Sequence, residues 1–395
     1  MSFSNYVERK GTDSKKWDLN GMLEMVSYAD DESIPMWVAD MDFKAPEFVQ
    51  DALLKRVKHG VFGYNTADKK YYEGIKFWLK NRNDWDIEES WIVPTSGVVP
   101  ALCYAIKAFT EHGDGVVVQN PVYPPFRNSV EINGREVVSN PLKLAGDRYE
   151  MDFDDLEKKL ANPKNKMLIL CSPHNPIGRV WTKNELEKVV SLCLKYKKII
   201  VSDEIHSDLI LFKNKFVSVG TLDREIKKYL IVCTSISKTF NLAGLKASNI
   251  IIPDSDLRER FINEMSKVAA KPVPNIFGAI AMEQCYSKEG ERWLEDLIVY
   301  LEDNYLFLKD YLEKRLPKIK CFPLEGTYLA WIDFRELNLT EEELRFKLEE
   351  EAKIVTDGGG IFGAEGVGFI RLNFACHRSV LEKALERLEK SFENI

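Results

Sequence analysis

The chain has 395 residues, of which 45% are hydrophobic and 30% are charged. This composition predicts a folded globular protein of about two domains and excludes a disordered chain, which lacks the apolar residues for a core. The net charge of −7, with acidic and basic residues interspersed, argues against a nucleic-acid-binding surface, because such a surface needs clustered Lys and Arg.

The cysteines, the histidines and the N-terminus indicate whether the protein has disulfides, a metal site or a membrane anchor. The seven cysteines are odd in number, widely spread and free of any C-x-x-C pair, so we expect buried reduced thiols rather than a disulfide framework. The five histidines lie far apart, so no metal site is expected. No apolar segment follows the charges of residues 1–10, and we therefore expect no signal peptide, no membrane anchor and a cytoplasmic protein.

The first quarter of the chain predicts an arm followed by two helices. Residues 34–43 (IPMWVADMDF) are apolar, bounded by acids and followed by Pro46, so we expect a short strand or an arm packed on the body. Apolar spacing predicts helices over about 46–58 and 69–81. Tyr64 lies between them in a glycine-flanked aromatic loop, which on sequence alone is a plain turn.

A Ser-Gly turn then opens a further helix. Residues 92–95 predict a short strand, and the helix begins at Ser96-Gly97-Val98. The free N–H groups and the positive dipole end of such a helix favour a phosphate group. The motif is not G-x-G-x-x-G, so a dinucleotide fold is not indicated.

The middle of the chain predicts a mostly parallel, doubly wound sheet. Buried strands are expected at residues 115–118, 166–171, 197–206 and 229–233. Helical patterns, clearest over 182–196, alternate with these strands, and this alternation is typical of an α/β sheet.

Polar or aromatic residues follow each of these strands, at the edge where α/β sheets bind ligands. Tyr123 can stack on a flat ligand or pack against the neighbouring prolines, and Asn175 lies in a rigid loop with two prolines. Asp203 either pairs with a charge or caps the turn that follows it. Lys238 lies among hydroxyls at a strand end, and a site that desolvates its amine makes it a nucleophile.

The pattern changes near residue 285 and predicts a smaller α+β unit. The expected elements are a long helix over 293–314, strands over 327–334 and 368–374, and a closing amphipathic helix around 380–388. We therefore assign residues 46–285 to a large domain, and residues 1–45 and 286–395 to a small domain built from the N-terminal arm and the C-terminal part. The glycine-rich stretch 358–363 is expected to be a mobile loop.

The order of these motifs resembles the fold-type I enzymes that use pyridoxal 5′-phosphate (PLP), the aspartate aminotransferase superfamily of class I and II, over nearly the whole chain. Four phrases resemble its MalY/PatB subgroup of cystathionine β-lyases: residues 36–43, 172–181, 203–209 and 237–245. The resemblance implies that PLP is the cofactor and that a small amino acid is the substrate.

The resemblance also implies a role for each residue near the cofactor ring. Lys238 would form the Schiff base, and Asp203 would pair with the pyridine nitrogen. Asn175 would donate to the phenolic oxygen, with His206 at a position where many aminotransferases have tyrosine. Tyr123 would stack on the ring, and we count it with Lys238 and Asp203 as catalytic.

Further residues are implied to hold the cofactor phosphate and the substrate. The phosphate group would be bound by Gly97, Val98, Ser235, Ser237, Lys246 and, from the neighbouring chain of a homodimer, Tyr64. Lys246 stands where aminotransferases commonly have arginine, which keeps the charge but loses the two-pronged grip. The substrate would be bound by Arg371, Asn175, Ala39 and Trp37, with Arg371 clamping the carboxylate. Its side chain would meet the aromatic surfaces of Trp37, Tyr123 and Phe362, which suit a thioether.

The subgroup resemblance favours β-elimination at a carbon–sulfur bond, with cystathionine or a related cysteine S-conjugate giving a thiol, pyruvate and ammonia. Transamination uses the same residues and is the first alternative. A regulatory protein-binding role with residual PLP binding is the second, because members that resemble MalY can bind a transcription activator.

Overall fold

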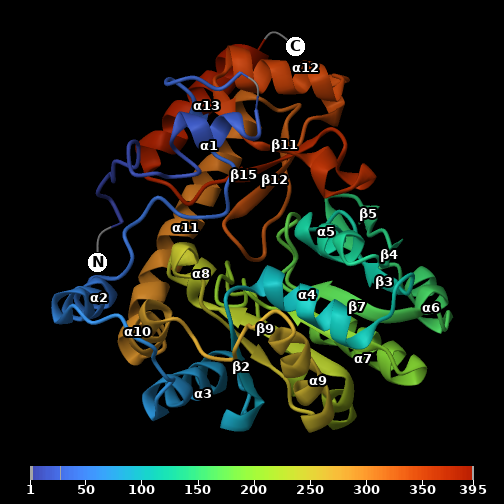
Figure 1. The fold of residues 1–395 in the computed structure, drawn as a ribbon. Coiled ribbons are helices and arrows are strands. Elements are labelled where there is room, and N and C mark those ends of the chain that lie inside the picture. Colours follow the sequence, from blue (N-terminus) through green and yellow to red (C-terminus); the bar gives the residue numbers. More distant parts are fainter. Residues whose placement is uncertain (1–2, 27, 394–395) are drawn as a thin grey trace.

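A seven-stranded sheet lies at the centre of the larger part of the molecule (Figure 1) in the computed structural model, which describes residues 3–26 and 28–393. Its spatial order is β2 (Ile92–Thr95), β10 (Ser248–Ile251), β9 (Leu230–Ser235), β8 (Ile199–Asp203), β7 (Asn165–Cys171), β3 (Gly115–Val118) and β4 (Glu136–Ser139). Neighbouring strands run parallel except β10, which is antiparallel to both β2 and β9. The expected mostly parallel sheet is confirmed.

Helices cover both faces of this sheet, because each buried strand presents apolar side chains alternately to the two sides. On one face, Val116, Val201 and Ile231 pack in one core cluster with residues of α4 (Val98–Phe109), α5 (Pro125–Ile132) and α9 (Ser255–Ser266). On the other face, Val117 and Ile200 belong to a second cluster, which includes residues of α3 (Lys69–Asn83), α6 (Phe153–Ala161), α7 (Lys183–Tyr196) and α10 (Ile276–Cys285).

Local signals fix the ends of several helices. Thr182 and Glu185 form a reciprocal capping box at the start of α7. The helix α2 (Glu47–His59) ends at Gly60, whose φ of 77° is the left-handed conformation that glycine adopts without strain. Further short elements of this part include β5 (Lys143–Ala145), β6 (Arg148–Glu150) and α8 (Ile236–Thr239).

A second, four-stranded sheet belongs to the smaller part of the molecule, at the top of Figure 1. Its order is β11 (Lys320–Cys321), β12 (Leu329–Asp333), β15 (Phe369–Asn373) and β14 (Asp357–Gly358), all antiparallel. The helices of this part are α1 (Leu19–Leu23), α11 (Lys288–Arg315), α12 (Glu341–Phe346) and α13 (Arg378–Phe392). The expected smaller α+β unit is present, and its long helix α11 begins five residues before the predicted start at residue 293.

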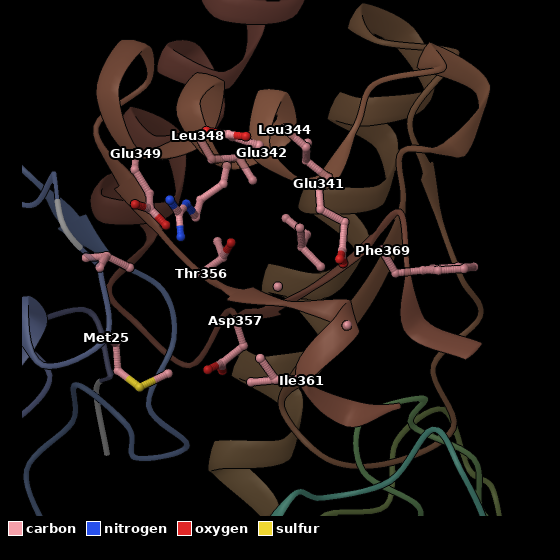
Figure 2. Close-up of a pocket in the computed structure, with 15 residues that line it drawn as sticks. Met25, Glu341, Glu342, Leu344, Leu348, Glu349, Thr356, Asp357, Ile361 and Phe369 are labelled. Carbon is pink, nitrogen blue, oxygen red and sulfur yellow. The ribbon is translucent and has the colours of Figure 1, made fainter. Parts of the chain in front are cut away.

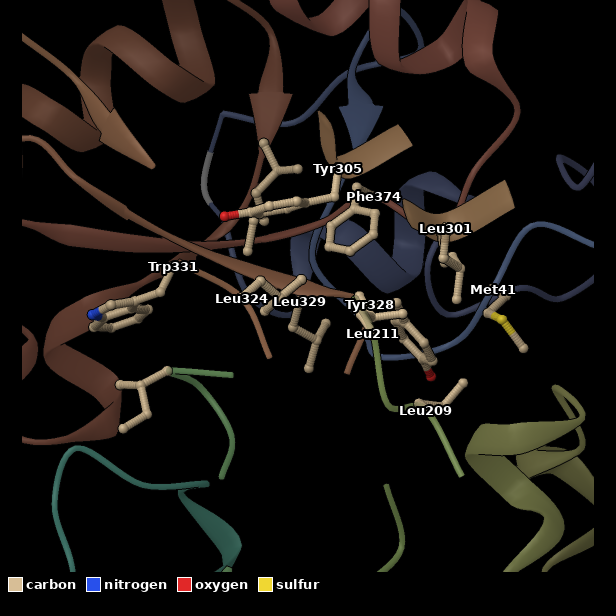
Figure 3. Packing of buried hydrophobic residues seen from close by; sticks show 14 of the residues in the cluster. Met41, Leu209, Leu211, Leu301, Tyr305, Leu324, Tyr328, Leu329, Trp331 and Phe374 are labelled. Carbon is tan, nitrogen blue, oxygen red and sulfur yellow. The ribbon is translucent and has the colours of Figure 1, made fainter. Parts of the chain in front are cut away.

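The N-terminal arm is part of this smaller unit. The arm strand β1 (Ile34–Pro35) pairs in parallel with β13 (Ile354–Val355) near the C-terminus. Met41 continues from the arm into the main core, where Figure 3 shows it close to Tyr328, Leu209 and Leu301. This core joins the arm, the second sheet, α11 and the segment after β8. No helix among residues 3–26 and 28–393 is long and apolar enough to cross a membrane.

The expectation of a mobile loop at residues 358–363 is wrong. Residues 357–358 form the edge strand β14, and Gly359–Phe362 form a 3-10 helix. Gly359 packs so closely against the backbone of Gly366 that an added Cβ would lie 1.9 Å from its oxygen. The phenyl ring of Phe362 is fully buried. The glycines therefore permit close packing here rather than motion.

Candidate active site

Lys238 lies in the short helix α8, directly after β9, and its amine points to the N-terminal arm. Its Nζ donates a hydrogen bond of 2.7 Å to the carbonyl of Ala39. The hydroxyl of Tyr328 donates to the same carbonyl over 2.8 Å. Burial, reinforced by the charge of Arg371, lowers the pKa of Lys238 to about 8. About a tenth of the amine is therefore neutral at pH 7.

Asp203 is the last residue of β8 and is only 4% exposed. One carboxylate oxygen accepts a hydrogen bond of 3.1 Å from the backbone N–H of Ile205, so the side chain does cap the turn that follows. Burial nevertheless raises the pKa of Asp203 to about 7. Among the residues that the structure describes, no cation forms an ion pair with it. The carboxylate therefore has capacity for a cationic partner.

His206 lies three residues further on and is also buried. Its Nδ1 has no hydrogen-bond partner in the described part of the chain. Burial, followed by the charges of Lys238 and Arg371, holds its pKa well below the ordinary value. The ring is therefore neutral at physiological pH, and its edge packs against Tyr328 at a centroid distance of 6.1 Å.

Arg371 on β15 and Asp357 on β14 face each other across an antiparallel strand pair. Two guanidinium nitrogens of Arg371 donate to the same oxygen of Asp357, at 3.1 and 2.5 Å. A third nitrogen donates to the side-chain oxygen of Asn175 over 2.9 Å, and the guanidinium lies over the ring of Phe362 at 4.9 Å. Arg371 and Asp357 are each 5% exposed. The arginine is therefore fixed in a buried, charge-compensated position.

Tyr123 links these two groups of residues. Its backbone N–H donates to the carbonyl of Asn175 over 3.1 Å. Burial raises the pKa of its phenol, while the charge of Arg371 opposes that shift and the charge of Asp203 adds to it. One electrostatic site is thus shared by residues from separate segments of the chain: Lys238, Asp203, His206, Asn175, Tyr123 and Arg371.

Two expected aromatic surfaces for the substrate side chain are not available. The indole of Trp37 packs in a small core cluster with Met22, Val26 and Val355, and its N–H donates to the carbonyl of Lys16. Only the carbonyl of Trp37 is directed to the site, 3.5 Å from a guanidinium nitrogen of Arg371. Phe362, fully buried beneath Arg371, supports the guanidinium instead.

The expected phosphate-binding residues meet at one edge of the large sheet because β10 pairs with both β2 and β9. Ser248 of β10 lies opposite Thr95 of β2 and opposite Ser235 of β9. Gly97, with a φ of 141°, follows Thr95 and leads into α4 at Val98. The N-terminus of α4 and the hydroxyls after β9 are therefore neighbours.

The hydroxyls at this edge are partly engaged. Ser235 donates to the carbonyl of Ala247 over 2.7 Å and lies 2.8 Å from the hydroxyl of Ser237. Ser248 has a buried hydroxyl with no hydrogen-bond partner among the described residues, and sequence reasoning missed it. Lys246 is exposed, with a φ of 47°. Its position gives a cation close to this edge.

Tyr64 is not brought to the other site residues within one chain. It lies in the loop between α2 and α3 and its side chain is fully exposed. Val61 and Phe62 in the same loop are also exposed, while Asn65 anchors the loop by a 3.0 Å hydrogen bond to the carbonyl of Pro274.

The arm segment that receives Lys238 is fixed by contacts that the sequence did not reveal. Arg9 binds the carboxylate of Asp40 at 2.8 Å and that of Asp42 at 2.7 Å. Asn373, from β15, donates to the carbonyls of Val38 and Asp40 over 2.6 and 2.7 Å. The Ala39 carbonyl is therefore held between the N-terminal arm and the second sheet. These residues are far apart in the chain, and no local pattern marks them.

The donor and acceptor set of this site fits PLP. A buried carboxylate without a cation suits a protonated pyridine nitrogen, and a partly neutral lysine suits an aldehyde. The unpartnered Ser248 hydroxyl and the start of α4 suit a phosphate group. Among residues 3–26 and 28–393, no group of His, Cys, Asp and Glu is arranged to hold a metal ion.

The chain is similar over almost its whole length to two bacterial proteins. It is 42% identical to cystathionine β-lyase PatB of Bacillus subtilis (strain 168), over 98% of this chain and 99% of that protein. It is 33% identical to Protein MalY of Escherichia coli (strain K12), over 98% of each.

Solved structures agree with these relatives. Cystalysin from Treponema denticola, which contains a PLP cofactor, superposes with a TM-score of 0.95 at 39% identity, covering 100% of this chain and 99% of that one. The PLP-bound C–S lyase from Staphylococcus hominis gives 0.91 at 30% identity, covering 99% and 98%. The family model for aminotransferase class I and II matches residues 38–388. The chain belongs to the class I and II aminotransferase family.

Proposed function

We propose that the protein is a PLP-dependent carbon–sulfur β-lyase that cleaves L-cystathionine or a related cysteine S-conjugate to a thiol, pyruvate and ammonia. The observation that carries the proposal is the pair of shifted groups at the end of the large sheet. Asp203 is buried and has no ion pair among the described residues, and burial lowers the pKa of Lys238 to about 8. Arg371, paired with Asp357, lies beside Asn175 in the same site. The similarity to PatB and cystalysin supports the choice of lyase.

Each residue has a task that its position allows. Bound PLP supplies an electron sink for the carbanion that forms when an amino acid loses its Cα proton. Asp203 would hold the positive charge of the pyridine nitrogen, and Tyr123 would cover one face of the ring. Arg371, with Asn175 beside it, would bind and orient the substrate carboxylate.

Lys238 would move the protons. With its pKa near 8, the amine is basic enough to accept the Cα proton and acidic enough to return a proton to the departing sulfur. The Ala39 carbonyl would hold the amine whenever it is free. The neutral ring of His206 adds no charge that would oppose protonation of the lysine.

β-Elimination is preferred over transamination for two reasons. The phrases at 36–43 and 172–181 that carry the subgroup resemblance lie outside the residues that every PLP aminotransferase needs. In addition, among the described residues Arg371 is the one arginine that hydrogen-bonds to Asn175, and its charge also acts on Lys238. An aspartate or glutamate transaminase would need a second cation for the side-chain carboxylate.

A single assay tests the reaction type. Purified holoenzyme is incubated with L-cystathionine and no added keto acid, and pyruvate and free thiol are measured together. Equal amounts of both products are expected. A second incubation adds 2-oxoglutarate to the same mixture. The proposal fails if neither product forms in the first incubation while, in the second, 2-oxoglutarate is converted to glutamate at the expense of an amino acid. In that case the chain is a transaminase with the same site.

We also propose a homodimer in which Tyr64 of one chain completes the phosphate site of the other. Its full exposure beside Val61 and Phe62 supports an interface at this loop. Hybrid dimers of Tyr64→Ala and Lys238→Ala chains should recover activity, because one of their two sites is intact. An active monomer in sedimentation velocity would contradict the shared site. The domain limits and the cytoplasmic location stay predictions.

A further inference from the structure

A cavity of about 550 Å³ lies on the outer side of the second sheet, beside its edge strand β14 (Figure 2). Its walls come from the N-terminal arm, α12, the turn after α12 and the segment 356–361. Much of the lining is apolar: Met25, Val26, Leu344, Leu348, Ile361, Phe369 and Ile370. The cavity therefore offers an apolar body a place to bind.

The charged groups of the lining are mostly acidic. Glu341, Glu342, Glu349 and Asp357 contribute carboxylates, and Arg345 contributes one guanidinium. Asp357 is already compensated by Arg371, so three carboxylates face one cation. Since no described ion pair joins the other four side chains, the cavity carries a net negative charge.

Among these acidic side chains, Glu349 is the buried one that lacks a hydrogen-bond partner in the described structure. It is 5% exposed, and its Oε2 has no hydrogen-bond partner among the described residues. Burial raises its pKa to about 7 even though Arg345 acts in the opposite direction. An unpaired buried carboxyl group is costly, and a native protein retains one mainly where a ligand or function needs it.

The backbone around Glu349 is also unusual. Residues Lys347–Glu351 form a π-helical turn that continues α12. Such wide turns are rare, and they occur frequently at functional sites because they redirect side chains from the regular helical face. In Figure 2 the Glu349 carboxylate lies on one side of the cavity and the Glu341 carboxylate on the other, with Asp357 below them.

We propose that this cavity binds an organic ammonium ion with an apolar body. The ammonium N–H would donate to the free oxygen of Glu349, and the apolar body would cover Leu344, Leu348 and Phe369. An anion is disfavoured by the acidic lining. A divalent metal ion is disfavoured because, within the described ranges, no three acidic or histidine side chains are close enough to ligate one.

Binding is measured by calorimetry on the holoenzyme with N,N-dimethylhexylammonium as the probe. This tertiary ion has one N–H donor and cannot form an imine with the cofactor, so it reports on this cavity without cofactor chemistry. The neutral analogue 1-hexanol is the matched control. We expect saturable binding of one probe ion per chain, at least about tenfold tighter than hexanol. Equal affinity for both compounds, or no saturation by the ion, would overturn the proposal.

Three variants locate the site. Glu349→Gln should weaken binding about ten- to a hundredfold, because a charge-assisted hydrogen bond is lost. Glu350→Gln removes the same charge from the neighbouring residue, which does not line the cavity, and should change affinity less than about threefold. Arg345→Gln removes the opposing cation and should strengthen binding about threefold.

The set of variants keeps the test valid if one of them misfolds. Arg345 is exposed and has an effect of opposite sign, so the Arg345→Gln result stands even if Glu349→Gln does not fold. Cofactor absorbance and thermal midpoint are recorded for each protein. If Glu349→Gln folds and binds as tightly as the parent, or if Arg345→Gln does not strengthen binding, the site is not here. No readout uses turnover, so the result is independent of the proposed lyase reaction.

Discussion

The two halves of the candidate active site treat buried charge in opposite ways. Lys238 and Asp203, at the end of the large sheet, have no ion pair in the described structure, and burial shifts both pKa values toward neutrality. Arg371, on the second sheet, is locked to Asp357 by two hydrogen bonds and to Asn175 by a third.

This difference separates a reactive half from a positioning half. An unpaired buried group changes its protonation readily, which suits proton transfer and pairing with a charged cofactor. A paired group keeps its charge and its geometry, which suits recognition of a planar carboxylate. The following predictions test this division, from the largest expected effect to the smallest.

Removing the reactive amine should have the largest effect. In Lys238→Ala the proton acceptor is gone, and the rate of pyruvate release from L-cystathionine should fall about 10⁴-fold. The exposed helix residue Lys55, changed to Ala, serves as the control and should retain full activity. A loss smaller than about tenfold in Lys238→Ala would assign the proton transfer to another residue.

Replacing the unpaired carboxylate should have the next largest effect. Asp203→Asn keeps the shape and the hydrogen bond to Ile205, but cannot hold a cationic pyridine nitrogen, so turnover should fall about 10³-fold while cofactor absorbance is retained. Asp256→Asn, an exposed acid of α9, is the matched control. Near-normal turnover of Asp203→Asn would show that the residue serves only as a turn cap.

Breaking the paired half should cost stability. Arg371→Met leaves Asp357 buried without a cation, so the free energy of unfolding of the cofactor-free protein should fall by about 3–5 kcal/mol. The double change Arg371→Met with Asp357→Leu removes both charges and should recover at least half of that loss. Urea unfolding measures both values. Equal losses in the single and double variants would mean that the pair is not the source.

Removing the charge of Lys238 from the unpaired half should raise the free energy of unfolding, and the size of this change should depend on pH. In the cofactor-free protein, Lys238→Met removes a buried cation and should raise the free energy of unfolding by roughly 2 kcal/mol at pH 7. The folded-state pKa of about 8 lies below the ordinary 10.5, so the penalty is fully present below pH 8 and disappears as the pH rises from 8 to 10.5. Urea unfolding at pH 7 and pH 10.5 checks this, and a pH-independent difference would contradict it.

The fold was largely predictable because its signals are local. Buried strands followed by polar residues placed Asn175, Asp203 and Lys238 at one sheet edge. Such patterns do not specify partners that meet only through tertiary structure. Asp357, directly before the predicted loop 358–363, was not singled out, although its position opposite Arg371 follows from the pairing of β14 with β15. The spatial order of the strands determines which residues lie opposite each other, and no single segment of the sequence specifies that order.

Backbone contacts escaped prediction for a different reason. Every residue type has a backbone carbonyl, so nothing in the sequence marks that of Ala39 as the acceptor for Lys238 and Tyr328. The Ser248 hydroxyl was missed because β10 was not among the predicted strands. The carbonyl of Trp37 lies beside Arg371, but the direction of its ring depends on packing against Met22 and Val355.

The carbonyls of Trp37 and Ala39 determine which mutations the segment 37–39 can accept. One lies beside Arg371 and the other holds Lys238, so a span of three residues sets the separation between the carboxylate-binding group and the amine. Because the spacer is main chain, exchange of the Val38 side chain between the two carbonyls should be accepted readily. Insertion or deletion of one residue there would change the spacing itself, so homologous sequences should keep the length of this segment.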